Sequence, residues 1–220
     1  DVAATFTNFA MSGIDKVHFG LEAAVSIPIY HTLALNGAVS WGQYTYDSNP
    51  YYLQTQDNSG DIVSDGYVYW KDFRVESTPQ TAVNVGLSWR SNNNIYLSAD
   101  FNYYNNMYLS MSPIYRTDAV ITGGMASGDI EHLRRQEKFD SAYTLNASIG
   151  KNWYIHRKYT LGFSLDVKNI LNNQDIKTGG YEQTRLSKNT ETTVTTYQAF
   201  DSKYFYMFGT TYYLNLYFRF

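Results

Sequence analysis

The chain has 220 residues, a net charge of −3 and a mean hydropathy of −0.40. It contains no cysteine, which excludes a disulfide scaffold, a cysteine-ligated metal site and a thiol nucleophile. The mild acidity provides no basic face for nucleic acid, so we expect no such partner, and no stretch approaches the roughly 18 consecutive apolar residues of a transmembrane helix.

Aromatic residues make up 17% of the chain, and 22 of them are tyrosines. Tyr and Trp favour the membrane–water interface, where one end of the ring is apolar and the other is wet. A membrane-spanning strand is hard to detect by average hydropathy, because its polar residues cancel its apolar ones. The composition is therefore compatible with a protein that crosses a membrane with β-strands.

Seven stretches alternate apolar and polar residues with a period of two, which predicts an all-β protein. They are 17–29, 33–45, 81–89, 95–107, 143–153, 159–168 and 204–220. The opening stretch, 1–15, alternates weakly and is predicted to be the tip of a partial strand. The last stretch exceeds the roughly 9–11 residues that cross a bilayer at a tilt. We expect it to be the closing strand of a membrane barrel, paired with the strand Tyr159–Asn169.

The connections between these strands alternate in length. Short turns are predicted near residues 30, 92 and 156, and long loops over 46–79, 112–138 and 172–203. This alternation is typical of an antiparallel transmembrane β-barrel, with short periplasmic turns and long extracellular loops. The alternative is a soluble β-sandwich, in which a second sheet would cover the apolar faces.

Seven full strands and one partial strand leave two interpretations of the barrel. Small membrane barrels begin at 8 strands, so the chain is either an eight-stranded barrel with an incomplete first strand or the C-terminal part of a larger one. The length of the three outer loops favours the larger barrel. The Tyr and Asn on the polar face favour it too, because they suit a wide, hydrated interior.

Four stretches resemble the C-terminal portion of the SusC/RagA-like TonB-dependent outer-membrane receptors of Bacteroidetes. They are SGIDKVHFGLEAAV (12–25), TPQTAVNVGLSWRS (78–91), LDVKNILNNQDIKTGGYEQTR (165–185) and YFYMFGTTYYLNLYFRF (204–220). The resemblance implies a barrel of 22 strands, of which residues 1–220 supply the C-terminal segment without the plug domain. It also implies a cell outer-membrane location and import of an oligomeric nutrient, a peptide or a glycan, driven by the inner-membrane proton gradient through TonB.

The partners that the resemblance implies are the outer-membrane lipid, the remaining strands and plug of the same receptor, TonB and a SusD-like surface lipoprotein. A terminal aromatic residue resembles the signal that the barrel-assembly machinery recognises, and Leu214, Leu216, Phe218 and Phe220 share the predicted lipid-facing side of the last strand. The alternative function is a small outer-membrane barrel with a structural or adhesive role.

The segment 179–185 is the best candidate for a functional outer loop. Its glycines free the backbone, and Tyr181, Glu182, Gln183 and Arg185 offer the stacking and hydrogen bonds that bind sugars or peptides. The alternative is that Tyr181 and Arg185 only hold the loop against the barrel wall or a plug. Five aromatic residues near predicted strand ends are expected to form an interfacial girdle: Trp41, Trp89, Trp153, Tyr204 and Tyr206.

No motif in the chain points to catalysis or to a cofactor. The stretch 57–61 has oxygen ligands at alternate positions, as in a calcium loop, but it lacks the downstream Glu and is better explained as a solvated turn. The four histidines, at positions 18, 31, 132 and 156, do not have the spacing of a zinc site. We therefore expect no enzyme activity, no cofactor and no metal.

Overall fold

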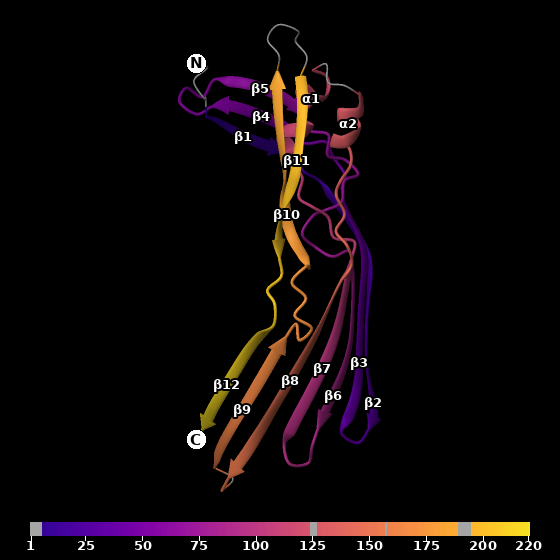
Figure 1. Cartoon of the computed structure of the whole chain (residues 1–220), viewed down its shortest axis with the longest axis vertical. Helices are drawn as coiled ribbons and strands as arrows, with labels where there is room; N and C mark the ends of the chain where they lie inside the picture. The colour runs from indigo at the N-terminus through magenta and orange to yellow at the C-terminus, as the bar shows by residue number, and fades with distance from the viewer. Residues whose placement is uncertain (1–5, 124–126, 157, 189–194) are drawn as a thin grey trace.

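The computed structural model describes residues 6–123, 127–156, 158–188 and 195–220, which form mainly antiparallel β-strands (Figure 1). The strands are β1 (Thr7–Ser12), β2 (Lys16–Tyr30), β3 (Leu33–Tyr46), β4 (Tyr51–Gln56), β5 (Ile62–Tyr67), β6 (Thr81–Arg90), β7 (Ile95–Asn105), β8 (Ala142–Ile155), β9 (Tyr159–Lys168), β10 (Lys177–Lys188), β11 (Thr195–Tyr206) and β12 (Thr211–Arg219). The helices are η1 (Pro113–Arg116), α1 (Asp118–Ile121) and α2 (Ser127–Leu133). None of the described helices is long and apolar enough to span a membrane.

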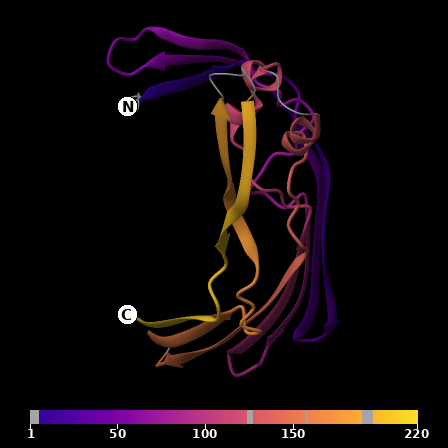
Figure 2. The same ribbon diagram turned by 45° about the horizontal axis from the view of Figure 1, so that its top comes forward.

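The main sheet has seven strands in the order β12-β9-β8-β7-β6-β3-β2. It contains the seven predicted strands in antiparallel neighbour pairs, and β12 lies beside β9 as expected. The sheet is curved but open (Figure 2). Within the described residues β2 pairs only with β3 and β12 only with β9, so this part of the chain does not close into a barrel.

The two ends of the main sheet differ, as the loop lengths predict. The three short turns and the C-terminus lie together at one end, which we call the turn end (Figure 1). The long connections 47–80, 106–141 and 169–210 lie at the other, the loop end, where they build further strands and the three short helices.

One face of the main sheet is apolar and remains exposed. The register places Leu165 between Ile149 and Leu214 on three neighbouring strands. Ile149 in turn lies opposite Leu97, so apolar residues stay beside apolar residues from strand to strand. Leu21 is 69% exposed and Leu216 is 71% exposed. A β-sandwich is wrong for this part of the chain, because no second sheet among the described residues covers this face.

The opposite face is polar, and its side chains hydrogen-bond from strand to strand. Asn84 Nδ2 donates to Asn102 Oδ1 at 2.9 Å, and Asn102 Nδ2 donates to Thr144 Oγ1 at 3.4 Å. The hydroxyls of Ser98 and Ser148 lie 2.8 Å apart in a further cross-strand bond. These bonds satisfy polar groups that water would otherwise have to reach.

Two predicted loops contain regular structure. The connection after β3 folds into the hairpin β4–β5, and the opening stretch pairs with β4 as β1 instead of joining the main sheet. The segment predicted as a loop over 172–203 contains most of the long hairpin β10–β11.

The closing strand is shorter than predicted. Residues 207–210 interrupt the stretch 204–220, so Tyr204 and Tyr206 belong to β11 and the last strand begins at Thr211. The cause is a contact with a distant segment: Asn169 Nδ2 donates to Phe208 O at 3.0 Å, and the Thr210 N–H donates to Asn172 Oδ1 at 3.1 Å. These asparagine side chains replace the strand partners of the backbone.

The hydrophobic core lies at the loop end. Tyr46, Tyr52, Val68, Trp70 and Met111 are all buried there in one cluster, and the ring of Trp70 stacks on that of Tyr46 with centroids 4.6 Å apart. The core therefore holds the long connections together, and within the described residues the main sheet contributes only Tyr46 of β3 to this cluster.

Glycines on the polar face admit tyrosine rings. Gly162 lies opposite Tyr217, whose hydroxyl donates to Asn152 Oδ1, and a Cβ on Gly162 would overlap the Tyr217 ring. We expect Gly162→Ala to lower the free energy of unfolding in urea by about 1–3 kcal/mol, the usual cost of overpacking. The control is Gly37→Ala, whose Cβ would only touch Val25 Cγ1 at 3.5 Å. Equal stability of the two variants would contradict this packing.

Candidate functional site

The candidate site lies where the hairpin β10–β11 meets the connection 106–141 at the loop end (Figure 1). We call this contact the loop–hairpin junction. The four predicted residues Tyr181, Glu182, Gln183 and Arg185 all belong to β10, so they are held on a strand and not on a free loop. The side chain of Arg185 lies outside the described residues.

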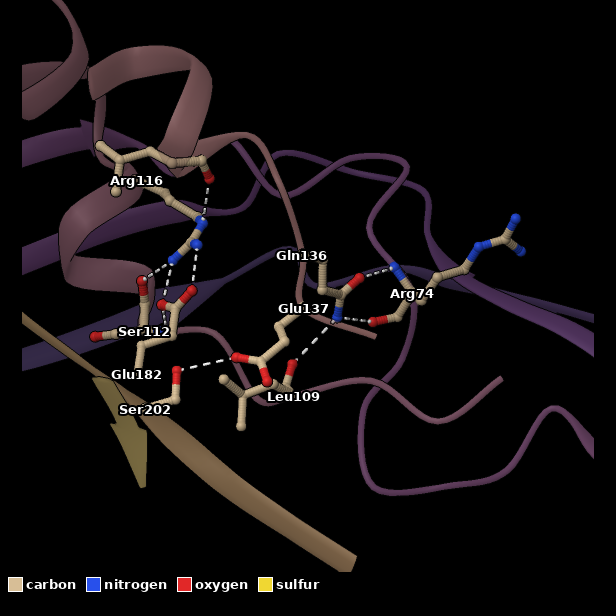
Figure 3. Close-up of polar contacts among 9 residues, drawn as sticks. Arg74, Leu109, Ser112, Arg116, Gln136, Glu137, Glu182 and Ser202 are labelled. Atoms are coloured by element: carbon tan, nitrogen blue, oxygen red, sulfur yellow. Dashed lines mark hydrogen bonds and ion pairs between the residues drawn. The ribbon is translucent and has the colours of Figure 1, made fainter. Parts of the chain in front are cut away.

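Glu182 forms the central contact of the junction (Figure 3). Arg116 Nη1 donates to Glu182 Oε2 at 2.7 Å, and Arg116 Nη2 donates to Glu182 Oε1 at 2.6 Å. The Arg116 side chain is 2% exposed and that of Glu182 is 18% exposed. This is the two-pronged geometry that makes arginine–carboxylate pairs strong and directional.

The rest of the Arg116 guanidinium is also satisfied. Its Nε donates to Leu133 O at 2.9 Å and its Nη1 to Ser112 O at 3.0 Å, while the Ser112 N–H donates to Glu182 Oε2 at 3.0 Å. A buried charge is tolerated only when it is paired and hydrogen-bonded in this way. One arginine thus joins η1, the end of α2 and the hairpin.

The backbone of the hairpin is irregular at this point. The pairing of β10 with β11 shifts register between Tyr181 and Gln183, so Glu182 lies at a β-bulge. Bulges redirect side chains, and this one directs Glu182 at Arg116. Tyr181 is half-exposed, with its ring 6.2 Å from that of Phe205.

Glu137 forms the second polar contact of the junction. Its carboxylate accepts hydrogen bonds from the Tyr204 hydroxyl at 2.6 Å and the Ser202 hydroxyl at 3.1 Å, and Lys177 Nζ lies 3.7 Å from it. The hydrogen bond to Glu137 raises the pKa of Tyr204 above its ordinary value of 10. Because the neutral hydroxyl is the donor, this contact persists as the pH passes the ordinary tyrosine value and is lost only above the raised pKa.

Gln136, next to Glu137, joins the connection 106–141 to the connection 47–80. The Arg74 N–H donates to Gln136 Oε1 at 2.8 Å, and Gln136 Nε2 donates to Arg74 O at 2.8 Å (Figure 3). The amide of Gln136 therefore bonds the backbone of Arg74 as a neighbouring strand would. Together with Arg116 and Glu137, it joins all three long connections.

A pocket of about 560 Å³ opens between the two sides of the junction. Its lining includes Gln183 and Asp201 from the hairpin and Arg135 from the connection after α2, with Phe200 and Tyr204 as aromatic walls. Its size is within the roughly 300–1,000 Å³ of small-molecule sites. Glu182 and Gln183 both line the pocket, but both carboxylate oxygens of Glu182 bind Arg116, so Gln183 is the predicted residue that best fits a ligand-facing role.

Sequence reasoning missed the residues on the opposite side of this junction. Arg116, Gln136 and Glu137 lie within 112–138, for which the sequence predicts only a long loop. Their partners are 62 to 67 positions away in sequence, at Arg74, Glu182 and Tyr204. No local pattern indicates a contact across that separation.

The other candidate residues lie in two places. Leu214, Leu216, Phe218 and Phe220 are all exposed at or just beyond β12, at 55–93%. Trp89 and Trp153 lie near the turn end of the main sheet. The placement of Tyr204 and Tyr206 in the closing strand is wrong, because both lie in β11.

No group of three or more metal-binding side chains gathers within the described part of the chain. The stretch 57–61 forms the turn between β4 and β5, where Asn8 Nδ2 donates to Asp57 Oδ1 and the Asp61 N–H donates to Ser59 Oγ. Its oxygens bond the fold itself.

Comparison of the chain with protein-family models, with curated proteins and with solved structures finds no match.

The Arg116–Glu182 pair makes a direct prediction. We expect Glu182→Gln to destabilise the junction by about 3–5 kcal/mol, because it leaves a buried guanidinium without its counter-charge. Hydrogen exchange of the η1 and β10 amides measures the effect. Glu131→Gln is the control, because its pair with Arg135 is 67–75% exposed and is worth at most about 1 kcal/mol. Equal exchange in both variants would show that the buried pair does not hold the hairpin.

Proposed function

We propose that this chain forms seven consecutive strands of a transmembrane barrel in the cell outer membrane, within a TonB-dependent transporter of the SusC/RagA-like kind. One observation carries the proposal: one face of the main sheet is apolar and exposed, while the other is polar and hydrogen-bonded across strands. Lipid on the first side and a hydrated lumen on the second account for both faces.

The two free edges of the main sheet support a barrel with more strands. An exposed strand edge carries unpaired N–H and C=O groups, and in lipid each unpaired group costs several kcal/mol. Among the described residues β2 and β12 lie at opposite edges and do not pair with each other. Further strands between them, up to the 22 that the resemblance implies, satisfy both edges.

The loop end supports the proposed transport function. The three long connections and the pocket at the loop–hairpin junction form a polar and aromatic surface beside the proposed lumen. We propose that it contributes to capture of an oligomeric nutrient, a peptide or a glycan, with a surface lipoprotein as partner. TonB would supply the energy through a plug domain of the same receptor.

The second candidate function is a small outer-membrane barrel with a structural or adhesive role. Interlocked loops such as those at the junction favour it, because a rigid surface suits binding to other proteins. The intact mass separates the two: a species near 25.3 kDa supports the small barrel, and one several times larger supports the receptor.

Uptake tests the transport function itself. A strain that lacks this protein should lose growth on an oligopeptide or oligosaccharide source that the parent strain uses, and a proton-gradient uncoupler should abolish uptake in the parent. Growth of the deletion strain on every oligomer that the parent uses would contradict an import role.

The two faces of β9 predict that an introduced charge destabilises the barrel on one face and has little effect on the other. Leu165 lies on the apolar face and the adjacent Ser164 on the polar face, opposite Asn215. Leu165→Arg should destabilise the membrane-inserted barrel by about 2–4 kcal/mol, the cost of arginine near the bilayer midplane. Ser164→Arg should change its stability little, because the new charge faces the lumen. Equal effects on urea unfolding in lipid vesicles would contradict this assignment of the faces.

The terminal aromatic residues predict an assembly defect. Phe218→Ala together with Phe220→Ala removes two rings from the exposed apolar side of β12. We expect lower levels of this variant in the outer membrane, measured by immunoblot of separated membranes. The control is Tyr213→Ala with Tyr217→Ala on the other face, and normal levels of the phenylalanine variant would contradict an insertion signal.

A further inference from the structure

Charge is distributed unevenly along the main sheet. The segments 23–46, 77–99, 141–165 and 211–220 include the three short turns and the final strand, and they contain none of the chain's 20 Asp and Glu residues. They contain five of its 17 Lys and Arg residues: Arg90, Lys151, Arg157, Lys158 and Arg219. Arg157 lies outside the described residues. The turn end is therefore cationic although the whole chain is acidic.

Lys151 belongs to the apolar face. It lies in register with Ile95 on one side and Phe163 on the other, and its side chain is half-buried. Its Nζ lies 5.2 Å from the centre of the Trp153 ring, and Trp153 is two residues nearer the turn. The stem of Lys151 thus follows the apolar surface while its amine extends towards the turn end, as lysines do at a membrane boundary.

Lys158 places a second amine on the same hairpin. It follows the turn after β8, is exposed, and its Nζ lies 5.1 Å from the centre of the Tyr159 ring. That ring stacks on Phe218 with centroids 5.7 Å apart, and Phe218 adjoins Phe220. Both lysines therefore border one band of aromatic side chains on the apolar face.

Neither lysine has an ion pair within the described residues. Arg219 lies on the polar face, over the ring of Tyr217, and so does not belong to this outer surface. The complementary partner carries a negative group for the two amines and an apolar chain for the aromatic band beneath them. An anionic phospholipid has both parts, whereas a free anion offers only the first.

We propose that the turn end of the hairpin β8–β9 binds anionic phospholipid, with Lys151 and Lys158 as the cations that face its headgroups. The inference rests on the proposed function, since the lipid must lie against the apolar face of an inserted barrel. Its acyl chains would lie along Trp153, Leu161 and Phe218, which are 41–55% exposed.

Lipid retention tests this site. The intact protein is reconstituted in equal amounts of phosphatidylcholine and phosphatidylglycerol, stripped by detergent, and its retained lipids are measured by mass spectrometry. We expect about tenfold preference for phosphatidylglycerol, since each lysine near an anionic surface adds a several-fold gain. Lys151→Gln with Lys158→Gln should bring retention near parity, and the control Lys168→Gln with Lys203→Gln should keep the preference.

Three results would overturn the site: no preference in the natural protein, an unchanged preference in the Lys151 and Lys158 variant, or loss of the preference when inorganic phosphate is added at constant ionic strength. The last result would indicate a site for free phosphate. Vesicle flotation separates this test from the proposed function. A protein that does not float with either lipid contradicts the membrane barrel, whereas one that floats without preference contradicts only the lipid site.

Discussion

The structure depends on the apolar face of the seven-stranded sheet. Side chains such as Leu21 and Leu216 remain about 70% exposed on it, and burying an apolar side chain of this size is worth roughly 1.5–3 kcal/mol. A sheet that leaves a whole face uncovered in water loses that free energy at every such position. In the barrel that we propose, lipid would restore it, and the opposite face, with its bonded Asn84, Asn102 and Thr144, would line a hydrated interior.

The loop end is organised differently, because its long connections bury apolar residues against one another. It therefore builds a conventional core around Tyr52 and Trp70 and adds three polar contacts between its long connections. The bidentate pair of Arg116 and Glu182 is the most buried of them. Because an unpaired guanidinium would be costly there, the pair fixes where the hairpin β10–β11 lies and so defines the pocket beside Gln183.

The two ends of the sheet also differ in the surroundings they suit. Acidic residues at the loop end pair with cations or accept hydrogen bonds, as Glu137 and Glu182 do. The charged residues of the turn end are all basic. Lys151 and Lys158 there lie over aromatic rings instead of against carboxylates. A barrel between two aqueous compartments meets different headgroups and partners on each side. This asymmetry agrees with the orientation that the loop lengths predict, with the short turns in the periplasm and the long loops outside the cell.

The sequence by itself determined the strands of the main sheet, their antiparallel order and their two faces, because period-two alternation is local and a slip of one residue would exchange the faces. It also determined the alternation of short and long connections. Only the tertiary structure decided that 204–220 is broken at Phe208, that the segment containing Glu182 is a strand, and that Arg116 pairs with it. Those outcomes depend on side chains tens of residues apart, such as Asn169 with Phe208, which no local pattern indicates.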